Sequence, residues 1–348
     1  MKLKLFRGKH VSCNRPLALK FIKPCFLTLK CLKEKKDCST TRSDVSKFFV
    51  IMRQYRLYSV RPSEDRHHGQ KMEEGVRLQY VSYRLPHNQQ LSPPIVVMHG
   101  LAQSLSSWRR VARHLCSKGP RRVISVNARN HGASPQTNGH TALNMASDIL
   151  TLLRRMGLTR MVALGHGMGG RAMMTLALVQ PFLVERLIVV DVTPGPVPDD
   201  WYFSRERFEM MTQIAPTIPG HLTLNQGRLF VLKKVKHNLK DYKDIMTILQ
   251  NLRKPSENSF AWSLNAKAVL NSWTDLVTHY EDTLKGLKPY TGEVLLIGGS
   301  QSKFVTSSNI EIMKKYFPNT TVEYLDTGHQ VFAEMPKKFV QLVAKFTR

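Results

Sequence analysis

Short unbroken runs of apolar residues recur along the chain from about residue 95 onward. Runs of this kind suit strands that are buried on both faces of a parallel sheet. At Arg77–Tyr83 apolar and polar residues alternate loosely, which predicts a half-exposed strand instead. The predicted buried strands are Ile95–Met98, Val123–Val126, Met161–Leu164, Leu187–Val190 and Val294–Ile297, and a further strand is expected at Thr321–Leu325.

Segments with helical character separate these strands. A chain that alternates strand and helix in this way is typical of an α/β fold. We therefore expect a mostly parallel central sheet with helices on both faces. The predicted helices are about Trp108–Leu115, Ala142–Met156, Arg171–Gln180 and Glu311–Tyr316.

One long insertion interrupts this alternation between Leu187–Val190 and Val294–Ile297. It holds roughly 100 residues, far more than a single crossover connection needs. Helices are expected at Trp201–Met211, Leu229–Leu252 and Ala266–His279, with Pro and Gly residues between them. The pattern predicts a helical lid, at about residues 195–288, over the carboxyl edge of the sheet. The lid would be embedded in one domain that spans residues 72–348.

The composition narrows the class of protein. Of 348 residues, 42% are hydrophobic and 22% are charged, which excludes wholesale disorder, a collagen-like chain and a coiled coil. No stretch approaches the ~20 apolar residues of a membrane-spanning helix, so no transmembrane segment is expected. Contact with the surface of a membrane stays compatible with the sequence.

The formal net charge of +27 is unevenly distributed. Residues 1–71 hold 18 Lys and Arg against 5 Asp and Glu, and the remaining chain holds 34 against 20. Such charge suggests nucleic acid as a partner, but no nucleic-acid-binding motif accompanies it, so we do not expect that partner. Four of the five cysteines lie in the basic arm without the paired spacing of a zinc site, leaving Cys116 alone in the body. We therefore expect neither a metal nor an organic cofactor.

The arm, residues 1–71, has the character of a targeting segment. Around Phe48–Pro62 it carries Arg53, Arg56 and Arg61, with no acid between Asp44 and Glu64. Stretches that are rich in Arg and poor in acid are typical of mitochondrial transit peptides. The alternative is an unstructured basic tail without an address, on a cytoplasmic protein. The mitochondrial prediction is tested by imaging a fusion of the arm to a fluorescent protein, and diffuse fluorescence would contradict it.

The most specific motif is the glycine-rich segment Gly165–Gly170, which follows the predicted strand Met161–Leu164. Strand, tight turn and helix together form the geometry of a nucleophile elbow, G-x-S-x-G. In that turn the central residue is held in a strained conformation and projects its side chain above the sheet. Here the central residue is Gly167, in the order Gly165-His166-Gly167-Met168-Gly169-Gly170.

With these motifs in order, the chain resembles the α/β-hydrolase superfamily from about residue 76 to residue 348. Within it, the likeness is to the branch of mitochondrial α/β-hydrolase domain-containing protein eleven and of bacterial YbfF-like esterases. The likeness is weak in the lid. The segments that carry it are His99-Gly100-Leu101, Val126–Ser134, Gly165–Gly170, Leu183–Pro194, Leu296–Ser300 and Gly328-His329.

The resemblance implies a serine nucleophile where this chain has Gly167. Glycine offers no oxygen to attack a carbonyl carbon, so no acyl-enzyme can form there. Ser104 and Ser134 lie on neighbouring loops, and nothing in the sequence places either beside the base. By the same resemblance, the oxyanion hole consists of the backbone N–H groups of Leu101 and Met168.

The other catalytic positions are partly kept. The resemblance places the general base at His329, although a histidine on a surface loop would look the same in sequence. The loop Gly298–Ser302, where the acid usually stands, has no carboxylate. Asp191 is the alternative acid position, or else a turn residue before Thr193-Pro194. A lid aspartate of some relatives aligns with Lys267, which could not orient a protonated histidine.

Three hypotheses for function follow. The first is a catalytically impaired hydrolase that binds an acyl or ester small molecule, or a protein partner. The second is a serine-independent ester hydrolase in which His329 activates water. The third is a basic scaffold that uses the lid lysines to bind anionic lipid or nucleic acid, with Lys233, Lys234, Lys236, Lys240 and Lys243 beside Arg228. A solvated helix face explains these lysines equally simply.

Overall fold

The structure is a computed structural model that describes residues 72, 74–86, 92–198, 204–237, 239 and 242–348. The basic arm, residues 1–71, lies outside the described residues. Its role as a targeting segment and the mitochondrial location therefore stay predictions.

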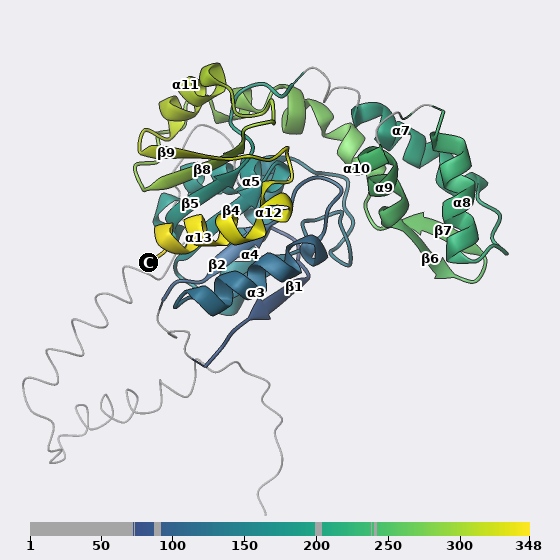
Figure 1. The fold of residues 1–348 in the computed structure, drawn as a ribbon, viewed down its shortest axis with the longest axis horizontal. Coiled ribbons are helices and arrows are strands. Elements are labelled where there is room, and N and C mark those ends of the chain that lie inside the picture. The colour runs from purple at the N-terminus through teal and green to yellow at the C-terminus, as the bar shows by residue number, and fades with distance from the viewer. Residues whose placement is uncertain (1–71, 73, 87–91, 199–203, 238, 240–241) are drawn as a thin grey trace, which may run out of the picture. The chain divides into compact units, whose positions relative to one another are not determined.

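A seven-stranded sheet forms the centre of the domain, in the order β1-β3-β2-β4-β5-β8-β9 (Figure 1). Only β1 runs antiparallel, against β3, and every other pairing in this sheet is parallel. The predicted parallel sheet is therefore confirmed. The strands are β1 Tyr80–Tyr83, β2 Ile95–Met98, β3 Val123–Val126, β4 Met161–His166, β5 Val184–Val190, β8 Val294–Gly299 and β9 Thr320–Leu325.

Burial explains why the apolar runs became strands. All residues of β2, β3, β4 and β8 are buried, as expected of strands that are covered on both faces. β1 is an edge strand and is largely exposed. It begins at Tyr80 rather than at Arg77, where the alternation suggested, because only Tyr80–Tyr83 pair with β3.

Two layers of helices cover the sheet. One face packs against α3, α12 and α13, and the other packs against α4, α5 and α11. The alternating residues of β2 divide between the two cores, Val97 toward α3 and Val96 toward α4 and α5. These helices are α3 Arg109–Lys118, α4 Ala142–Met156, α5 Met168–Val179, α11 Ser307–Tyr316, α12 Val331–Glu334 and α13 Pro336–Phe346, with short 3₁₀ turns η2 Leu105–Trp108 and η3 Pro181–Leu183.

The insertion, residues 191–293, is not purely helical as predicted. It holds α7 Ser204–Ile214, η4 Ala215–Thr217, α8 Leu224–Val235, α9 Tyr242–Asn251, α10 Ala266–Asn271, η5 Thr274–Thr278 and η6 Glu281–Leu284, but also a hairpin of β6 Leu252–Ser256 and β7 Ser259–Trp262.

The single helix predicted over Leu229–Leu252 is thus wrong in its middle, because α8 ends at Val235 and α9 begins at Tyr242. The hairpin forms where Leu252 buries its side chain while Arg253 is exposed. Pro255 is tolerated there because this two-stranded sheet consists of edge strands, in which a missing N–H costs little.

Arg171 joins both ends of the insertion to α5. Its guanidinium donates to the carbonyl oxygens of Leu276 and Val277 at 2.7 and 2.8 Å and to that of Gly195 at 2.7 Å. The Tyr280 hydroxyl in turn donates to the Arg171 carbonyl oxygen at 2.7 Å. Because a buried guanidinium needs such partners, Arg171 holds the insertion against the carboxyl edge of the sheet.

Candidate active site

The turn between β4 and α5 has the geometry of an elbow. Gly167 separates β4 from α5 and adopts φ 51° and ψ −116°, a region that side chains strongly disfavour. A Cβ on Gly165 would collide with the Gly169 backbone, and one on Gly169 would collide with the Met98 carbonyl. Glycines are therefore required for the close approach of strand and helix on either side of the turn.

The space above Gly167 is open and faces a base. A Cβ built on Gly167 would lie 3.5 Å from His329 Nε2 and 3.9 Å from the Gly100 Cα. The first distance is an ordinary van der Waals contact, so a small side chain fits. The elbow thus keeps the direction in which a nucleophile would point, but carries no atom there.

The structure brings Asp191 and His329 together across 138 residues of chain, with Nδ1 2.7 Å from Asp191 Oδ2. In the neutral ring, an Nδ1–H that donates to the carboxylate leaves the lone pair on Nε2, the nitrogen nearest to Gly167. Asp191 follows β5, and His329 follows β9. The two residues can meet because β8 alone separates β5 from β9 in the sheet.

The Asp191 carboxylate is fully buried, yet all its bonds are made. Oδ1 accepts from the Gly299 amide at 2.9 Å, and Oδ2 accepts from the Ser302 hydroxyl at 2.5 Å as well as from His329. Sequence reasoning missed Gly299 and Ser302. The signal was the loop Gly298–Ser302 itself, which lacks a carboxylate but supplies the donors for one.

Ring contacts and hydrogen bonds hold His329 in place. The Phe304 ring stacks on it with centroids 4.4 Å apart, and the His166 ring lies 4.5 Å away. His166 Nε2 donates to the His329 carbonyl oxygen at 3.0 Å. The adjacent Gln330 accepts from Gln103 Nε2 at 2.8 Å, which ties this loop to the loop after β2.

The loop after β2 presents one backbone amide toward the cavity. The Gly100 amide donates to Gln103 Oε1 at 3.1 Å, and the Ala102 amide donates to His131 Nε2 at 3.2 Å. Within the described part of the chain, the amide of Leu101 between them donates to no protein group, nor does that of Met168. Both residues line the cavity beside Gly167, where two free N–H groups are suited to an oxyanion.

Two buried histidines, His99 and His131, join the loop after β2 to the loop after β3 by hydrogen bonds. His131 Nδ1 donates to the Arg129 carbonyl at 3.0 Å, while Nε2 accepts from Ala102. His99 is bonded in the same manner, between the Gly100 carbonyl and the Ala128 amide. Burial lowers the pKa of His99 to about 3 and that of His131 to about 4. Their role as acceptors depends on staying neutral, since a second ring proton would face an N–H group.

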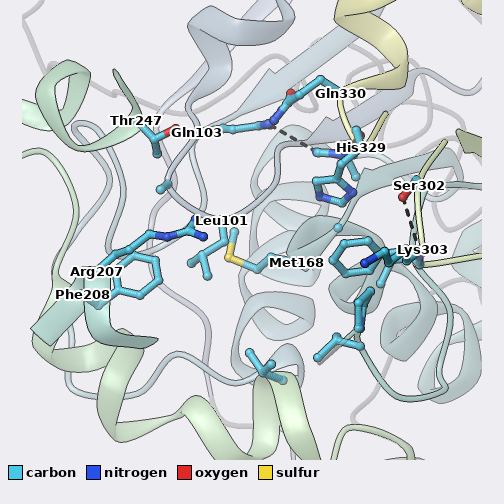
Figure 2. A pocket seen from close by; sticks show the side chains of 18 of the residues that line it. Leu101, Gln103, Met168, Arg207, Phe208, Thr247, Ser302, Lys303, His329 and Gln330 are labelled. Atoms are coloured by element: carbon cyan, nitrogen blue, oxygen red, sulfur yellow. Dashed lines mark hydrogen bonds between the residues drawn. The ribbon is translucent and has the colours of Figure 1, made fainter. Parts of the chain in front are cut away.

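A cavity of about 790 Å³ lies over Gly167, between the sheet and the insertion. In Figure 2, Leu101 and Met168 lie between Arg207 and Phe208 on one side and His329, Ser302 and Lys303 on the other. The lining is mainly apolar, and its size is in the range that encloses a small organic ligand. Apolar lining residues include Leu101, Met168, Val192, Val197, Phe208, Met211, Met246, Ile248, Leu276, Val277 and Phe304.

The remaining candidates lie elsewhere. Ser134 is buried and its hydroxyl donates to the Asn127 carbonyl at 2.7 Å, while Ser104 caps η2. Lys267 is exposed on α10 and does not line the cavity. Among the described residues, no group of three His, Cys, Asp or Glu side chains could hold a metal ion. No described helix has both the length and the apolar character to cross a bilayer.

Comparison with known proteins agrees with this architecture. A family model described as "alpha/beta hydrolase fold" matches residues 93–336, which is well over half of the chain. The chain belongs to the α/β-hydrolase fold family.

Relatives of this α/β-hydrolase include a protein named "sn-1-specific diacylglycerol lipase ABHD11". The Xenopus laevis protein is 32% identical over 273 residues, covering 78% of this chain and 85% of its own length. The Mus musculus protein of the same name is 31% identical over 268 residues, covering 76% and 84%. The resemblance predicted to that branch is therefore confirmed.

Among solved structures, one titled "Marine microorganism esterase" superposes with a TM-score of 0.69 at 22% identity. The match covers 78% of this chain and all of that one. At this identity the likeness concerns the fold alone.

The buried histidines predict how the stability of this α/β-hydrolase depends on pH. Unfolded, His99 and His131 titrate near 6.5, whereas folded they titrate at about 3 and about 4. Between these values the unfolded chain binds protons that the folded chain does not. The free energy of unfolding should therefore be highest above pH 6.5 and fall below it, by about 1.4 kcal/mol per pH unit for each histidine.

Urea unfolding at pH 7 and pH 5 measures this loss. A His131→Gln variant, which keeps a donor and an acceptor but does not titrate, should lose less stability on acidification than the wild type, by about 2 kcal/mol. The exposed His114→Gln variant is the control and should keep the dependence of the wild type. A free energy of unfolding that is equal at both pH values would contradict the assignment.

Proposed function

We propose that this protein binds an acyl ester in its cavity without forming an acyl-enzyme, as a catalytically impaired member of its family. The observation that carries the proposal is Gly167. It occupies the centre of an elbow whose strand, helix and facing base are otherwise in place. Covalent catalysis by a serine hydrolase needs an oxygen at that point, and glycine has none.

The chemistry of the cavity supports an acyl ligand. An apolar wall suits a hydrocarbon chain, and the amides of Leu101 and Met168 suit the ester carbonyl oxygen. The relatives named diacylglycerol lipase favour an acylglycerol-type ester within that class. In this proposal the insertion serves as the lid of the cavity. A protein partner would bind differently to the form with ligand and to the form without it.

Restoring the missing atom tests the proposal. In Gly167→Ser, the hydroxyl would point at His329 Nε2, because a Cβ there lies 3.5 Å from that nitrogen. Removing such a serine from a protease costs on the order of 10^6 in kcat, so we expect Gly167→Ser to raise hydrolysis of a short-chain p-nitrophenyl ester by at least about 10^3-fold. Backbone strain at this position should lower the free energy of unfolding by about 1–3 kcal/mol.

Two controls separate the nucleophile from its surroundings. Gly167→Ala carries the same strain without the hydroxyl and should stay as inactive as the wild type. Gly167→Ser combined with Asp191→Asn should lose most of the gain, since the imidazole then loses its charged partner. If Gly167→Ser folds but gains no activity, the missing hydroxyl is not the only reason why the site is inactive, and the proposal is contradicted.

A second candidate function rests on the Asp191–His329 pair, which keeps its full set of hydrogen bonds. His329 could take a proton from water bound above Gly167 while the water oxygen attacks the carbonyl carbon. The proton would then pass from Nε2 to the leaving alkoxide. This route needs no covalent intermediate but forgoes the rate that a nucleophilic serine supplies.

The two functions differ in the wild-type protein itself. The water route requires that purified wild type hydrolyses the ester, that His329→Ala abolishes this activity, and that serine-directed phosphonate inhibitors leave it unchanged. A wild type without measurable turnover, together with an active Gly167→Ser, supports the impaired form and excludes the water route for this substrate.

A further inference from the structure

The outer face of α8 combines exposed apolar and basic side chains. Gly227, Val231 and Val235 form the buried face of this helix. Leu229, Lys233 and Lys236 lie on the opposite side at helical spacing, and all three are exposed, Leu229 by 57% of its surface. A leucine is thus exposed to solvent on the same side of the helix as two lysines.

The helix α8 contacts α9, whose first residue lies at the cavity. Tyr242 begins α9, exposes 71% of its surface and also lines the cavity. Lys234, next to Lys233 in sequence, adds a further exposed charge on α8, with its ammonium 5.8 Å from the centroid of the Phe230 ring. We call the set Leu229, Lys233, Lys236 and Tyr242 the α8 face. Figure 1 shows α8 at the end of the insertion away from the central sheet, so that the sheet does not cover it.

The α8 helix itself carries only positive charge. No acid occurs between Glu209 and Asp241, whereas Arg228, Lys233, Lys234, Lys236 and Lys240 do. The acids of adjoining segments are Glu206 and Glu209 on α7, the latter paired with Arg205 at 2.9 Å, Glu257 in the turn of the hairpin, and, in sequence, Asp241 and Asp244 on either side of Tyr242. A surface of this charge attracts anionic partners.

We propose that the α8 face docks on an anionic phospholipid surface. Lysines near negatively charged headgroups contribute about fivefold each to partitioning, and a leucine beside them would bury its side chain at the boundary of the acyl chains. Tyrosine is enriched at the same depth. Nucleic acid would contact the lysines through its phosphates but would not bury the Leu229 side chain. A bilayer does both, so the combination of lysines and leucine favours a bilayer. The docked face would open onto the cavity at Tyr242.

Co-sedimentation of the full chain with vesicles of phosphatidylcholine and phosphatidylserine tests the docking. Lys233→Gln/Lys236→Gln should weaken partitioning about 30-fold, at ~1 kcal/mol for each lysine. Leu229→Ser should weaken it about tenfold, as expected for a largely buried leucine. Vesicles of phosphatidylcholine alone should bind all variants poorly.

Matched controls keep net charge and exposure equal. Lys337→Gln/Lys338→Gln removes two exposed lysines from α13, and Phe182→Ser removes an exposed aromatic from η3, which precedes β5 at the edge of the sheet opposite the elbow. Both should bind vesicles like the wild type. The basic arm is present in every protein, so its own contribution cancels.

Three results would overturn the proposal: equal losses in variants and controls, no loss in either variant, or a Leu229→Ser protein that binds normally while duplex DNA displaces the vesicles. The last would assign the lysines to nucleic acid. The docking does not depend on Gly167, so Gly167→Ser should bind vesicles unchanged. The failure of one proposal is therefore distinguishable from the failure of the other.

Discussion

The hydrogen bond between His329 and the buried carboxylate of Asp191 connects the sheet to the chemistry of the cavity. It joins loops that follow β5 and β9, and the loop after β8 between them supplies Gly299 and Ser302 as further donors. A buried carboxylate is costly unless such partners satisfy it. The strand order therefore has to bring three loops to one point, and the orientation of the imidazole depends on all of them.

The packing of the elbow does not depend on a side chain at its centre. Gly165 and Gly169 let β4 and α5 pack against each other and against β2, and this contact is needed by the core whether or not a reaction occurs. The amides of Leu101 and Met168 are part of the backbone and are placed by the same packing. A side chain at position 167 would support none of this packing, and glycine adopts φ 51° with the least strain.

The insertion serves two surfaces at once. Its inner side lines the cavity, and Arg171 is bonded to both of its ends. Its outer side presents Leu229 and the neighbouring lysines to solvent. Tyr242 is exposed and also lines the cavity.

The sequence by itself determined the sheet, the two helical layers and the position of the elbow. Apolar runs and glycine spacing are local consequences of burial and close approach, so they can be read along the chain: Ile95–Met98 and Ala142–Met156 have the predicted bounds. The absence of a hydroxyl at Gly167 was equally plain. Inside the insertion the same reasoning failed, because the hairpin at Leu252–Trp262 depends on packing against α8 and η4 rather than on local periodicity.

Only the tertiary structure decided which acid meets the base. In sequence Asp191 could equally have been a turn residue, and the loop after β8 gave no carboxylate to compare with it. The pairing with His329 depends on strand order, since residues 138 positions apart come within 2.7 Å only when β5, β8 and β9 lie side by side. The lowered pKa values of His99 and His131 could likewise not be predicted from the sequence, because burial and hydrogen-bond partners, not residue type, set them.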